Sequence, residues 1–397
     1  MAETSKTRKK YWDYWTRYVR PLGLDPTLQG EPYDWRIRSI TGFASRVPSG
    51  WYGNGSQIRV GSVRSALTAI GKTSAMANGI NPTKVFGSDK LAPRLQQQMD
   101  GYNKLDPPTK KKLPVEVDVP ECIAAGKTQG CAAKRNNKYR SASLMAAIGD
   151  LCLIAFYYLL RIGEYTVKGS RNETKQTKQF RLEDATFFRR DQQGKLRQLP
   201  RNSPDNMILS ADSATLRIQN QKNGWKNVCV NQEANGQSYF CPVRALGRRY
   251  VTIRKNSKSP EEAQKTFFSA YFVSGGGRKD VTDNDIRINL KIAAELLEYF
   301  PTRGIPTSSV DTHSLRGGGA NALSLAGYSD REIMKMGRWR SATFMEYIRE
   351  ELQCFSAGMS KKMSRMFNFV NIAGGTCHDI TPTVLVADYD TIVSDRE

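Results

Sequence analysis

Histidine is almost absent from this chain, and its cysteines show no regular spacing. Two histidines and seven cysteines occur among 397 residues, and no two cysteines form a CxxC pair. Structural zinc sites need several of these side chains at short intervals, so we expect no bound metal. An odd number of scattered cysteines also argues against a disulfide framework and predicts free thiols in a reducing compartment.

Long apolar segments are scarce as well. The most hydrophobic stretch runs from Ala142 to Leu160, but Asp150 lies in its middle and Arg161 follows it directly. A charge in the centre of a bilayer is costly, so this stretch predicts a buried helix and no membrane span. The start of the chain is polar and basic, which predicts that it is not a signal peptide.

Acidic residues are outnumbered by basic ones. Lys and Arg number 60 against 38 Asp and Glu, which gives a formal net charge of +22 and a sequence pI of about 9.7. A charge of this size favours a polyanionic partner, most simply a nucleic acid. The alternative is a basic protein without such a partner.

The spacing of apolar residues within 1–106 predicts a bundle of four amphipathic helices. Apolar residues recur at helical spacing within 11–19, 34–44, 63–70 and 91–102, and Ser62 is a suitable N-cap for the third helix. Three basic residues flank that helix: Arg59, Arg64 and Lys72. A solvated surface would explain them, but they also suit contacts with DNA phosphates.

A Pro- and Lys-rich linker is predicted at 107–120, because prolines prevent regular structure and lysines keep the segment solvated. Its three consecutive lysines are Lys110, Lys111 and Lys112. They suit contact with DNA, and they also match a nuclear import signal.

A second, mainly helical domain is predicted at residues 121–370. Strand-like runs at 185–189, 215–218 and 228–230 indicate a small antiparallel sheet, with Asn223 and Gly224 as a hairpin turn. Helices are expected at 242–253, 283–299, 314–326, 330–336 and 343–352. The fold class is therefore α+β. The acidic tail, 371–397, is expected to be disordered or to dock on a neighbouring subunit.

Six side chains of the second domain have the chemistry to cleave a phosphodiester without a metal. In chain order they are Arg161, Lys222, His313, Arg316, Trp339 and Tyr347. Arginine holds two phosphate oxygens with its planar fork, lysine can protonate a leaving oxygen, and a tyrosine hydroxyl can attack phosphorus. Singly, each has a structural explanation, such as a helix-end cation, a solvated lysine or a core tyrosine.

These residues resemble the tyrosine recombinase, or phage integrase, family, whose signature is Arg, Lys, His-x-x-Arg, His or Trp, then Tyr. The matching strings lie at 159–164, 221–224, 313–318 and 337–347. The family joins a helical core-binding domain that clamps DNA to a catalytic domain, so the resemblance covers nearly the whole chain. The Gly-Arg-Trp string is most similar to the Crypton-like recombinases of eukaryotic mobile elements.

The resemblance implies breakage and rejoining of double-stranded DNA through a 3′-phosphotyrosyl intermediate, with no metal or cofactor. Tyr347 would be the nucleophile, Arg161 and Arg316 would hold the scissile phosphate, and Lys222 would be the general acid. The implied assembly is a homotetramer on paired sites that is a monomer or dimer when free. The implied location is the nucleus in a eukaryotic host and the cytoplasm otherwise.

Several assignments keep an alternative. Glu164 matches a supporting acid of the family. Lys226 lies across the turn from Lys222 and is the second candidate for the general acid. Arg338 directly follows Gly337, where many members carry the His or Trp, so either Arg338 or Trp339 fills that position; the indole N–H of Trp339 favours the latter.

Two other functions are compatible with the sequence. One is a type IB topoisomerase, which uses a similar residue set, and the other is a domesticated DNA-binding protein that no longer cuts.

The three consecutive glycines at 317–319 lie within a predicted helix. Glycine is unfavourable inside a helix, so they predict a close approach of another element to that backbone.

Overall fold

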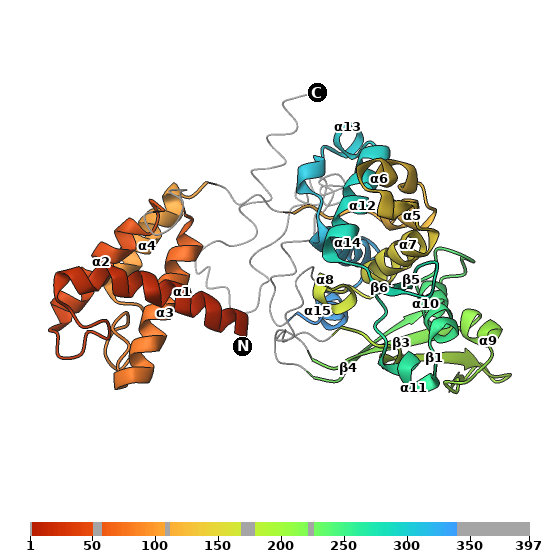
Figure 1. Ribbon diagram of the computed structural model, residues 1–397, viewed down its shortest axis with the longest axis horizontal. Coiled ribbons are helices and arrows are strands. Elements are labelled where there is room, and N and C mark those ends of the chain that lie inside the picture. The colour runs from red at the N-terminus through yellow and green to blue at the C-terminus, as the bar shows by residue number, and fades with distance from the viewer. Residues whose placement is uncertain (1, 51–57, 108–111, 168–178, 221–225, 340–397) are drawn as a thin grey trace, which may run out of the picture. The chain divides into compact units, whose positions relative to one another are not determined.

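The first part of the chain is a bundle of helices (Figure 1). The computed structural model describes residues 2–50, 58–107, 112–167, 179–220 and 226–339. The elements of the bundle are α1 (Ala2–Val19), the 3-10 helix η1 (Arg20–Leu22), α2 (Tyr33–Arg46), α3 (Val60–Asn78) and α4 (Pro93–Leu105). The four helices expected from the apolar periodicity are confirmed.

Aromatic residues on one face of α1 form much of the bundle core. Trp15 is fully buried, and its indole N–H donates to the carbonyl of Pro26 at 2.6 Å. Its ring meets the edge of Phe43 from α2, with 5.3 Å between ring centroids. Edge-to-face packing of this kind stabilises a core beyond simple burial of area.

The prediction of Ser62 as the N-cap of the third helix is wrong. The helix α3 begins at Val60, whose backbone N–H donates to the carboxylate of Asp106 at 2.9 Å. The acceptor for a first-turn N–H group therefore comes from the end of α4, far away in the sequence. A local sequence pattern does not contain that contact.

The second part of the chain, from residue 112, combines helices with two small sheets. Its helices are α5 (Asp118–Ala124), α6 (Gln129–Arg135), η2 (Asn137–Arg140), α7 (Ala142–Tyr157), α8 (Ile162–Tyr165), η3 (Leu182–Asp184), α9 (Asp205–Leu209), α10 (Pro242–Asn256), α11 (Pro260–Lys265), α12 (Asp283–Leu296), α13 (Tyr299–Arg303), η4 (Thr307–Ser309), α14 (Thr312–Leu325) and α15 (Asp330–Gly337). The mostly helical α+β class is confirmed. The segment predicted as a linker, 107–120, includes the start of α5.

The predicted buried helix is α7, at the centre of this part. Of its 16 residues, 12 are buried, including the charged Asp150. That carboxylate accepts hydrogen bonds from Nε and Nη2 of Arg248 at 2.9 and 2.6 Å, which compensates for its burial. Burial raises the pKa of Asp150, and Arg248 opposes that rise. None of the described helices is long and apolar enough to cross a membrane.

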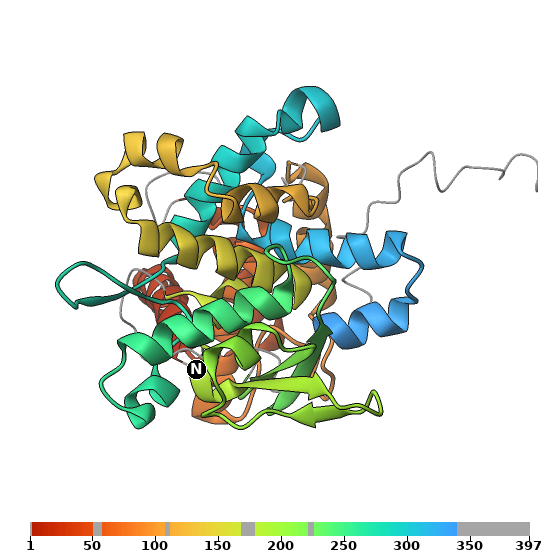
Figure 2. The ribbon, with the colours of Figure 1, turned by 90° about the vertical axis from the view of Figure 1, so that its right-hand side faces the viewer.

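The main sheet has the order β2-β1-β3-β4 and is antiparallel throughout. The strands β1 (Ala185–Arg190), β3 (Ser213–Ile218) and β4 (Val228–Glu233) confirm the three predicted runs, whereas β2 (Leu196–Gln198) was not predicted. A second sheet pairs β5 (Ala270–Phe272) with β6 (Arg278–Asp280). Figure 2 shows α10 lying across the main sheet, and α10 contacts both β3 and β4.

The helices after the sheet begin at or near their expected positions, with one difference. The expected helix at 283–299 ends at Leu296, because Glu298 adopts a left-handed conformation with φ of 51° before α13 begins. The expected helix at 343–352 lies outside the described residues, as does the acidic tail.

The close approach predicted around the glycines of α14 is confirmed at two of them. A Cβ on Gly318 would lie 1.8 Å from the carbonyl oxygen of Val115, and a Cβ on Gly319 would lie 2.3 Å from that of Phe156. Backbone atoms cannot move aside as a flexible side chain can. These glycines therefore allow α14 to pack directly on the end of α7 and on the segment before α5, which positions the residues described next.

Candidate active site

Arg161 and Glu164 form the first part of the site. Arg161 does not end the long helix α7; it precedes the one-turn helix α8. Its backbone N–H donates to Oε2 of Glu164 at 2.8 Å, and its Nη1 donates to Oε1 at 3.2 Å. Glu164 is fully buried. One buried carboxylate therefore holds both the backbone and the guanidinium of Arg161.

His313 and Arg316 come from the first turns of α14, which starts after Asp311 as N-cap. Their spacing of three residues places them on one face of the helix. His313 is exposed, whereas Arg316 is only 3% exposed. Nη1 of Arg316 donates to the carbonyl of Leu159, and Nη2 donates to the carbonyl of Gly337. These two acceptors set the orientation of the guanidinium.

The Gly337-Arg338-Trp339 turn folds an indole back over Arg316. Arg338 ends α15 in the left-handed conformation, with φ of 59°, and the backbone N–H of Trp339 donates to the carbonyl of Met334 at 3.0 Å. The Trp339 ring centroid then lies 4.2 Å from Cζ of Arg316. A Cβ at position 337 would lie 1.6 Å from a Trp339 ring carbon, so this turn requires glycine there.

Arg338 points to a different place from Trp339. Its side chain is fully buried, and Nη2 donates to Oε2 of Glu164 at 2.9 Å and to the carbonyl of Leu159 at 3.0 Å. A residue other than glycine is disfavoured in the left-handed conformation. Its contacts with Glu164 and with the carbonyl of Leu159 hold the residue in that conformation.

The turn also brings the two candidate phosphate-binding arginines together. Nη2 of Arg161 donates to the carbonyl of Arg338 at 3.5 Å, while Arg316 donates to the carbonyl of Gly337. These carbonyls belong to consecutive residues, so the two guanidinium groups reach the same short stretch of backbone. Figure 1 shows α8 and α15 close together, and α14 contacts α15.

Leu159 is a part of the site that the sequence did not reveal. Its φ of 49° is unusual for a leucine, and its carbonyl accepts from both Arg316 and Arg338. Any residue carries a carbonyl, so the side-chain sequence contains no signal for this role. A left-handed conformation held by its surroundings is typical of functional sites.

Positive charge predominates among the described side chains of the site. Arg161 and Arg338 are paired with the buried carboxylate of Glu164, and Arg316 shares the carbonyl of Leu159 with Arg338. Burial lowers the pKa of Arg338, Arg161 acts in the same direction, and Glu164 opposes both. Arginine nevertheless remains protonated. A fixed positive charge of this kind suits the stabilisation of a phosphate on which charge builds up.

Three tyrosines near Arg161 in the sequence are poorly placed to act as nucleophiles. The Tyr158 hydroxyl is buried and donates to the carbonyl of Ala214 at 2.9 Å. Tyr165 is also buried, and burial raises the pKa of both hydroxyls. Tyr157 is partly buried, and its hydroxyl accepts from the Asn235 side chain at 3.5 Å. Its pKa is likewise raised by burial.

Lys222 and Tyr347 lie outside the described residues. The strands that flank Lys222 are paired as expected, with Ile218 opposite Val228. The candidate general acid therefore belongs to the connection between β3 and β4. Lys226 is described and is exposed in the same connection.

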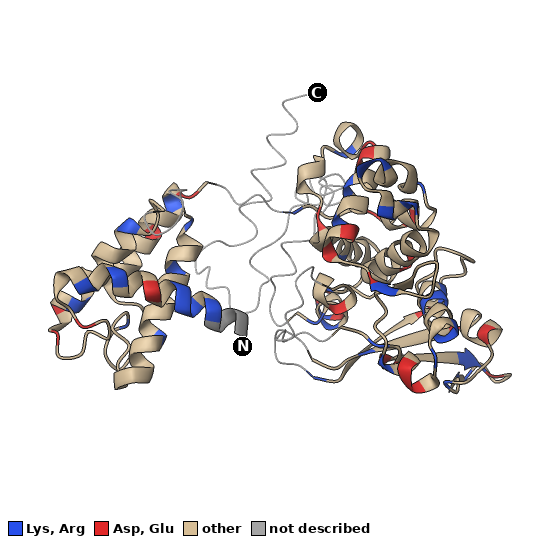
Figure 3. Ribbon diagram, viewed as in Figure 1, with Lys and Arg blue, Asp and Glu red and all other residues tan. Residues whose placement is uncertain are grey.

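The predicted DNA-binding residues are distributed over both parts of the chain, where Figure 3 shows many Lys and Arg residues. Arg59 precedes α3, Lys72 is exposed on it, and Arg64 lies 3.9 Å from the carboxylate of Asp100. Lys112 donates to the carbonyl of Ser308 at 2.9 Å. Lys110 and Lys111 lie outside the described residues. Contact of these side chains with DNA stays a prediction.

In the part of the chain that the structure describes, no group of three or more His, Cys, Asp or Glu side chains could hold a metal ion. Arg161 and Arg316 are instead the candidates for binding an anion.

Solved structures that resemble this chain include integrases and recombinases. The integrase of transposon Tn1549 in complex with transposon right-end DNA is 12% identical, covers 89% of this chain and 99% of its own, and gives a TM-score of 0.41. The same integrase with a circular-intermediate DNA gives 13% and 0.40. The XerA recombinase is 15% identical, covers 91% and 100%, and gives a TM-score of 0.35.

No family model and no curated protein matches the chain. Similarity at these identities and TM-scores does not establish an activity. The functional assignment therefore rests on the geometry around Arg161 and Arg316.

Proposed function

We propose that this protein is a site-specific tyrosine recombinase that breaks and rejoins DNA. The observation that carries the proposal is the convergence of Arg161 and Arg316 on the carbonyls of Arg338 and Gly337. Two arginines brought together from distant segments can bind the non-bridging oxygens of one phosphate. The exposed His313 lies on the same helical face as Arg316.

In the proposed reaction, the hydroxyl oxygen of Tyr347 attacks the scissile phosphorus. A 3′-phosphotyrosyl bond forms, and the bond from phosphorus to the 5′-oxygen breaks. Arg161 and Arg316 stabilise the charge on the non-bridging oxygens. Lys222 protonates the leaving 5′-oxygen, and His313 assists the arginines or accepts the tyrosine proton. A 5′-hydroxyl from another strand then reverses these steps.

The indole of Trp339, rather than the guanidinium of Arg338, fills the His or Trp position of the site. Trp339 lies over Arg316, where its N–H can donate to a phosphate oxygen. Arg338 supports the site through its buried ion pair with Glu164. Glu164 in turn holds Arg161, so these two residues position the binding groups without contacting DNA themselves.

The wider context of the enzyme is part of the same proposal. The substrate is double-stranded DNA of a mobile element, bound by a homotetramer on paired sites that is a monomer or dimer when free. The net charge of +22 supplies affinity for the phosphate backbone. The proposed relationship is to Crypton-like recombinases, and the proposed location in a eukaryotic host is the nucleus.

Formation of a covalent DNA adduct tests this function. The full-length protein, incubated in EDTA with nicked suicide duplexes, should form a protease-sensitive DNA adduct without added metal. Protein that binds the duplexes but forms no adduct on any of them would instead be a DNA-binding protein. Plasmid relaxation without exchange between two sites would indicate the type IB topoisomerase alternative.

Lys222→Ala is expected to reduce cleavage of ordinary DNA by roughly 10²–10⁴-fold, the usual contribution of a general acid. The same variant should cleave normally when the 5′-oxygen is replaced by sulfur, because a thiolate leaves without being protonated. Lys226→Ala is the matched control and should cleave both substrates at nearly the wild-type rate. Single-turnover cleavage rates measure the difference. If only Lys226→Ala shows this pattern, the general acid is Lys226.

A further inference from the structure

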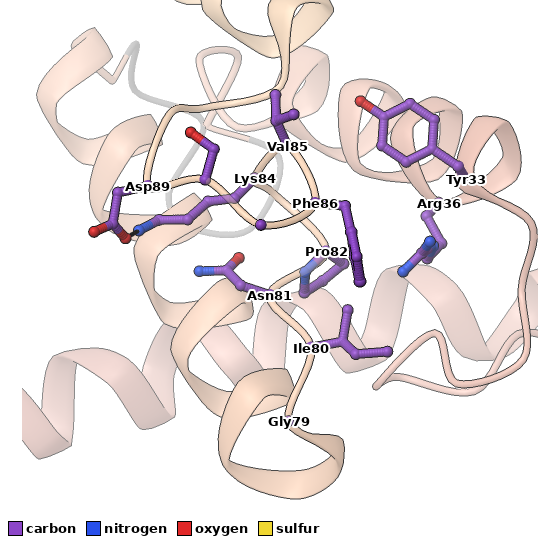
Figure 4. A pocket seen from close by; sticks show the side chains of 12 residues that line it. Tyr33, Arg36, Gly79, Ile80, Asn81, Pro82, Lys84, Val85, Phe86 and Asp89 are labelled. Carbon is purple, nitrogen blue, oxygen red and sulfur yellow. Dashed lines mark hydrogen bonds and ion pairs between the residues drawn. The ribbon is translucent and has the colours of Figure 1, made fainter.

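A pocket of about 480 Å³ opens in the N-terminal bundle, between the start of α2 and the loop that follows α3 (Figure 4). Tyr33 and Arg36 line it from α2, and Ile80, Lys84 and Phe86 line it from the loop. None of these residues belongs to the candidate active site.

The loop holds Phe86 in an exposed position. The N–H of Ser88 donates to the carbonyl of Val85 at 3.0 Å, and Gly87 supplies the φ of 70° that closes this turn. The N–H of Val85 donates in turn to the carbonyl of Lys90 at 3.1 Å. Phe86 is 90% exposed at the tip. Because the backbone of the turn is closed by hydrogen bonds, the exposed ring is part of an ordered structure.

Phe86 is one of several exposed apolar residues that line the pocket. Ile80, Val85 and Tyr33 line the same pocket and are also exposed. Single exposed apolar residues are common, but several of them around one concave site are typical of a binding surface. The flat ring of Phe86 stands on one side of the pocket, and Arg36 points toward it from the other side (Figure 4).

Arg36 places a positive charge at the side of the pocket opposite Phe86. Among the described residues, no hydrogen bond or ion pair engages its guanidinium, which lies 5.9 Å from the centre of the Tyr33 ring. Lys84, by contrast, is paired with Asp89. An aromatic ring facing a guanidinium is complementary to a flat π system attached to an anion. A nucleobase with its phosphate has this chemistry, since bases stack on both aromatic rings and guanidinium planes.

We propose that this pocket receives one unpaired base of the DNA, stacked between Phe86 and Arg36. The proposal rests on the proposed recombinase function, because strand breakage and exchange transiently unpair bases next to the cut. DNA is favoured over a protein partner because Arg36 is uncommitted and because Lys and Arg predominate in the bundle. The pocket would hold a base that the duplex has released.

The test compares two fluorescent duplexes of equal length and sequence, one fully paired and one with a single extrahelical 2-aminopurine. Wild-type full-length protein should bind the second duplex roughly tenfold more tightly, a ratio within the range for stacking one base. The 2-aminopurine fluorescence should fall on binding. Phe86→Ala should lose both effects and keep its affinity for the paired duplex, whereas Phe86→Trp should retain them.

Trp35→Ala is the matched control, because Trp35 is exposed on α2 but does not line the pocket. It should behave as wild type. Equal affinity of the wild type for both duplexes would overturn the proposal, as would a Phe86→Ala variant that weakens both duplexes equally. A change of oligomeric state in Phe86→Ala with unchanged base preference would also overturn it and would identify a protein interface. Covalent adduct formation is measured separately, so failure here leaves the recombinase proposal intact.

Discussion

The Tyr347→Phe variant is expected to bind DNA with wild-type affinity and to form no covalent adduct. The substitution removes only the hydroxyl oxygen that would attack phosphorus, so no phosphotyrosyl bond can form. Cleavage should fall by at least about 10³-fold, as expected for loss of a nucleophile. Affinity should be unchanged because it derives mainly from Lys and Arg contacts with phosphates. Adduct yield on nicked suicide duplexes and a gel-shift titration measure the two quantities.

Tyr328→Phe is the matched control for this experiment, since Tyr328 is an exposed tyrosine that precedes Tyr347 in the sequence. It should form the adduct at the wild-type level. Persistence of the adduct in Tyr347→Phe would show that another residue attacks the phosphate. The buried hydroxyls of Tyr158 and Tyr165 make them poor substitutes, so peptide mapping of such an adduct would be needed to find the nucleophile.

Glu164→Gln is expected to destabilise the protein by about 3–5 kcal/mol, the usual cost of breaking a buried ion pair. The amide keeps the size of the side chain but leaves the buried guanidinium of Arg338 without a compensating charge. Arg161 loses the same carboxylate, so phosphate binding in the site should also be impaired. Urea-induced unfolding measures the stability, and single-turnover cleavage measures the function.

Glu233→Gln is the control for stability, because Glu233 makes a comparable contact with Arg190, at 3.0 and 3.1 Å, on an exposed surface. It should cost less than about 1 kcal/mol. Equal losses in Glu164→Gln and Glu233→Gln would contradict the importance assigned to the buried pair.

A double variant separates support of the fold from positioning of the site. Replacing both Glu164 and Arg338 by methionine removes the two buried charges together, which is often neutral for stability. Stability should then recover toward the wild-type value. Cleavage should remain impaired, because Arg161 still lacks the carboxylate that orients it. Recovery of both properties would show that Glu164 has only a structural role.

Periodicity and turn residues predicted most of the elements around the site. The apolar run of α7, the strands β1, β3 and β4, and the starts of α10, α12 and α15 followed from patterns within single segments. The short strand β2 was missed because three largely exposed residues give no alternation to detect. The start of α3 was misplaced because its acceptor, Asp106, is contributed by another helix.

The surface around Phe86 was also not predicted. A phenylalanine beside a glycine is compatible with a buried position as well as with an exposed turn. Only the hydrogen bonds that close the turn place its ring in solvent, opposite Arg36. The pocket exists because α2 and the loop after α3 come together, and that contact is absent from any local pattern.

The amino-acid sequence by itself determined which residue types are available and in what order: an arginine, a lysine, a histidine one turn before a second arginine, a tryptophan and a tyrosine. The tertiary structure decided where the described ones lie and what they contact. Both Arg338 and Trp339 were candidates for one position, and the left-handed backbone at 338 turns them apart. Trp339 meets Arg316 and Arg338 meets Glu164. Carbonyls of Leu159 and Gly337 complete the arrangement, and they can do so only where α7, α14 and α15 pack together.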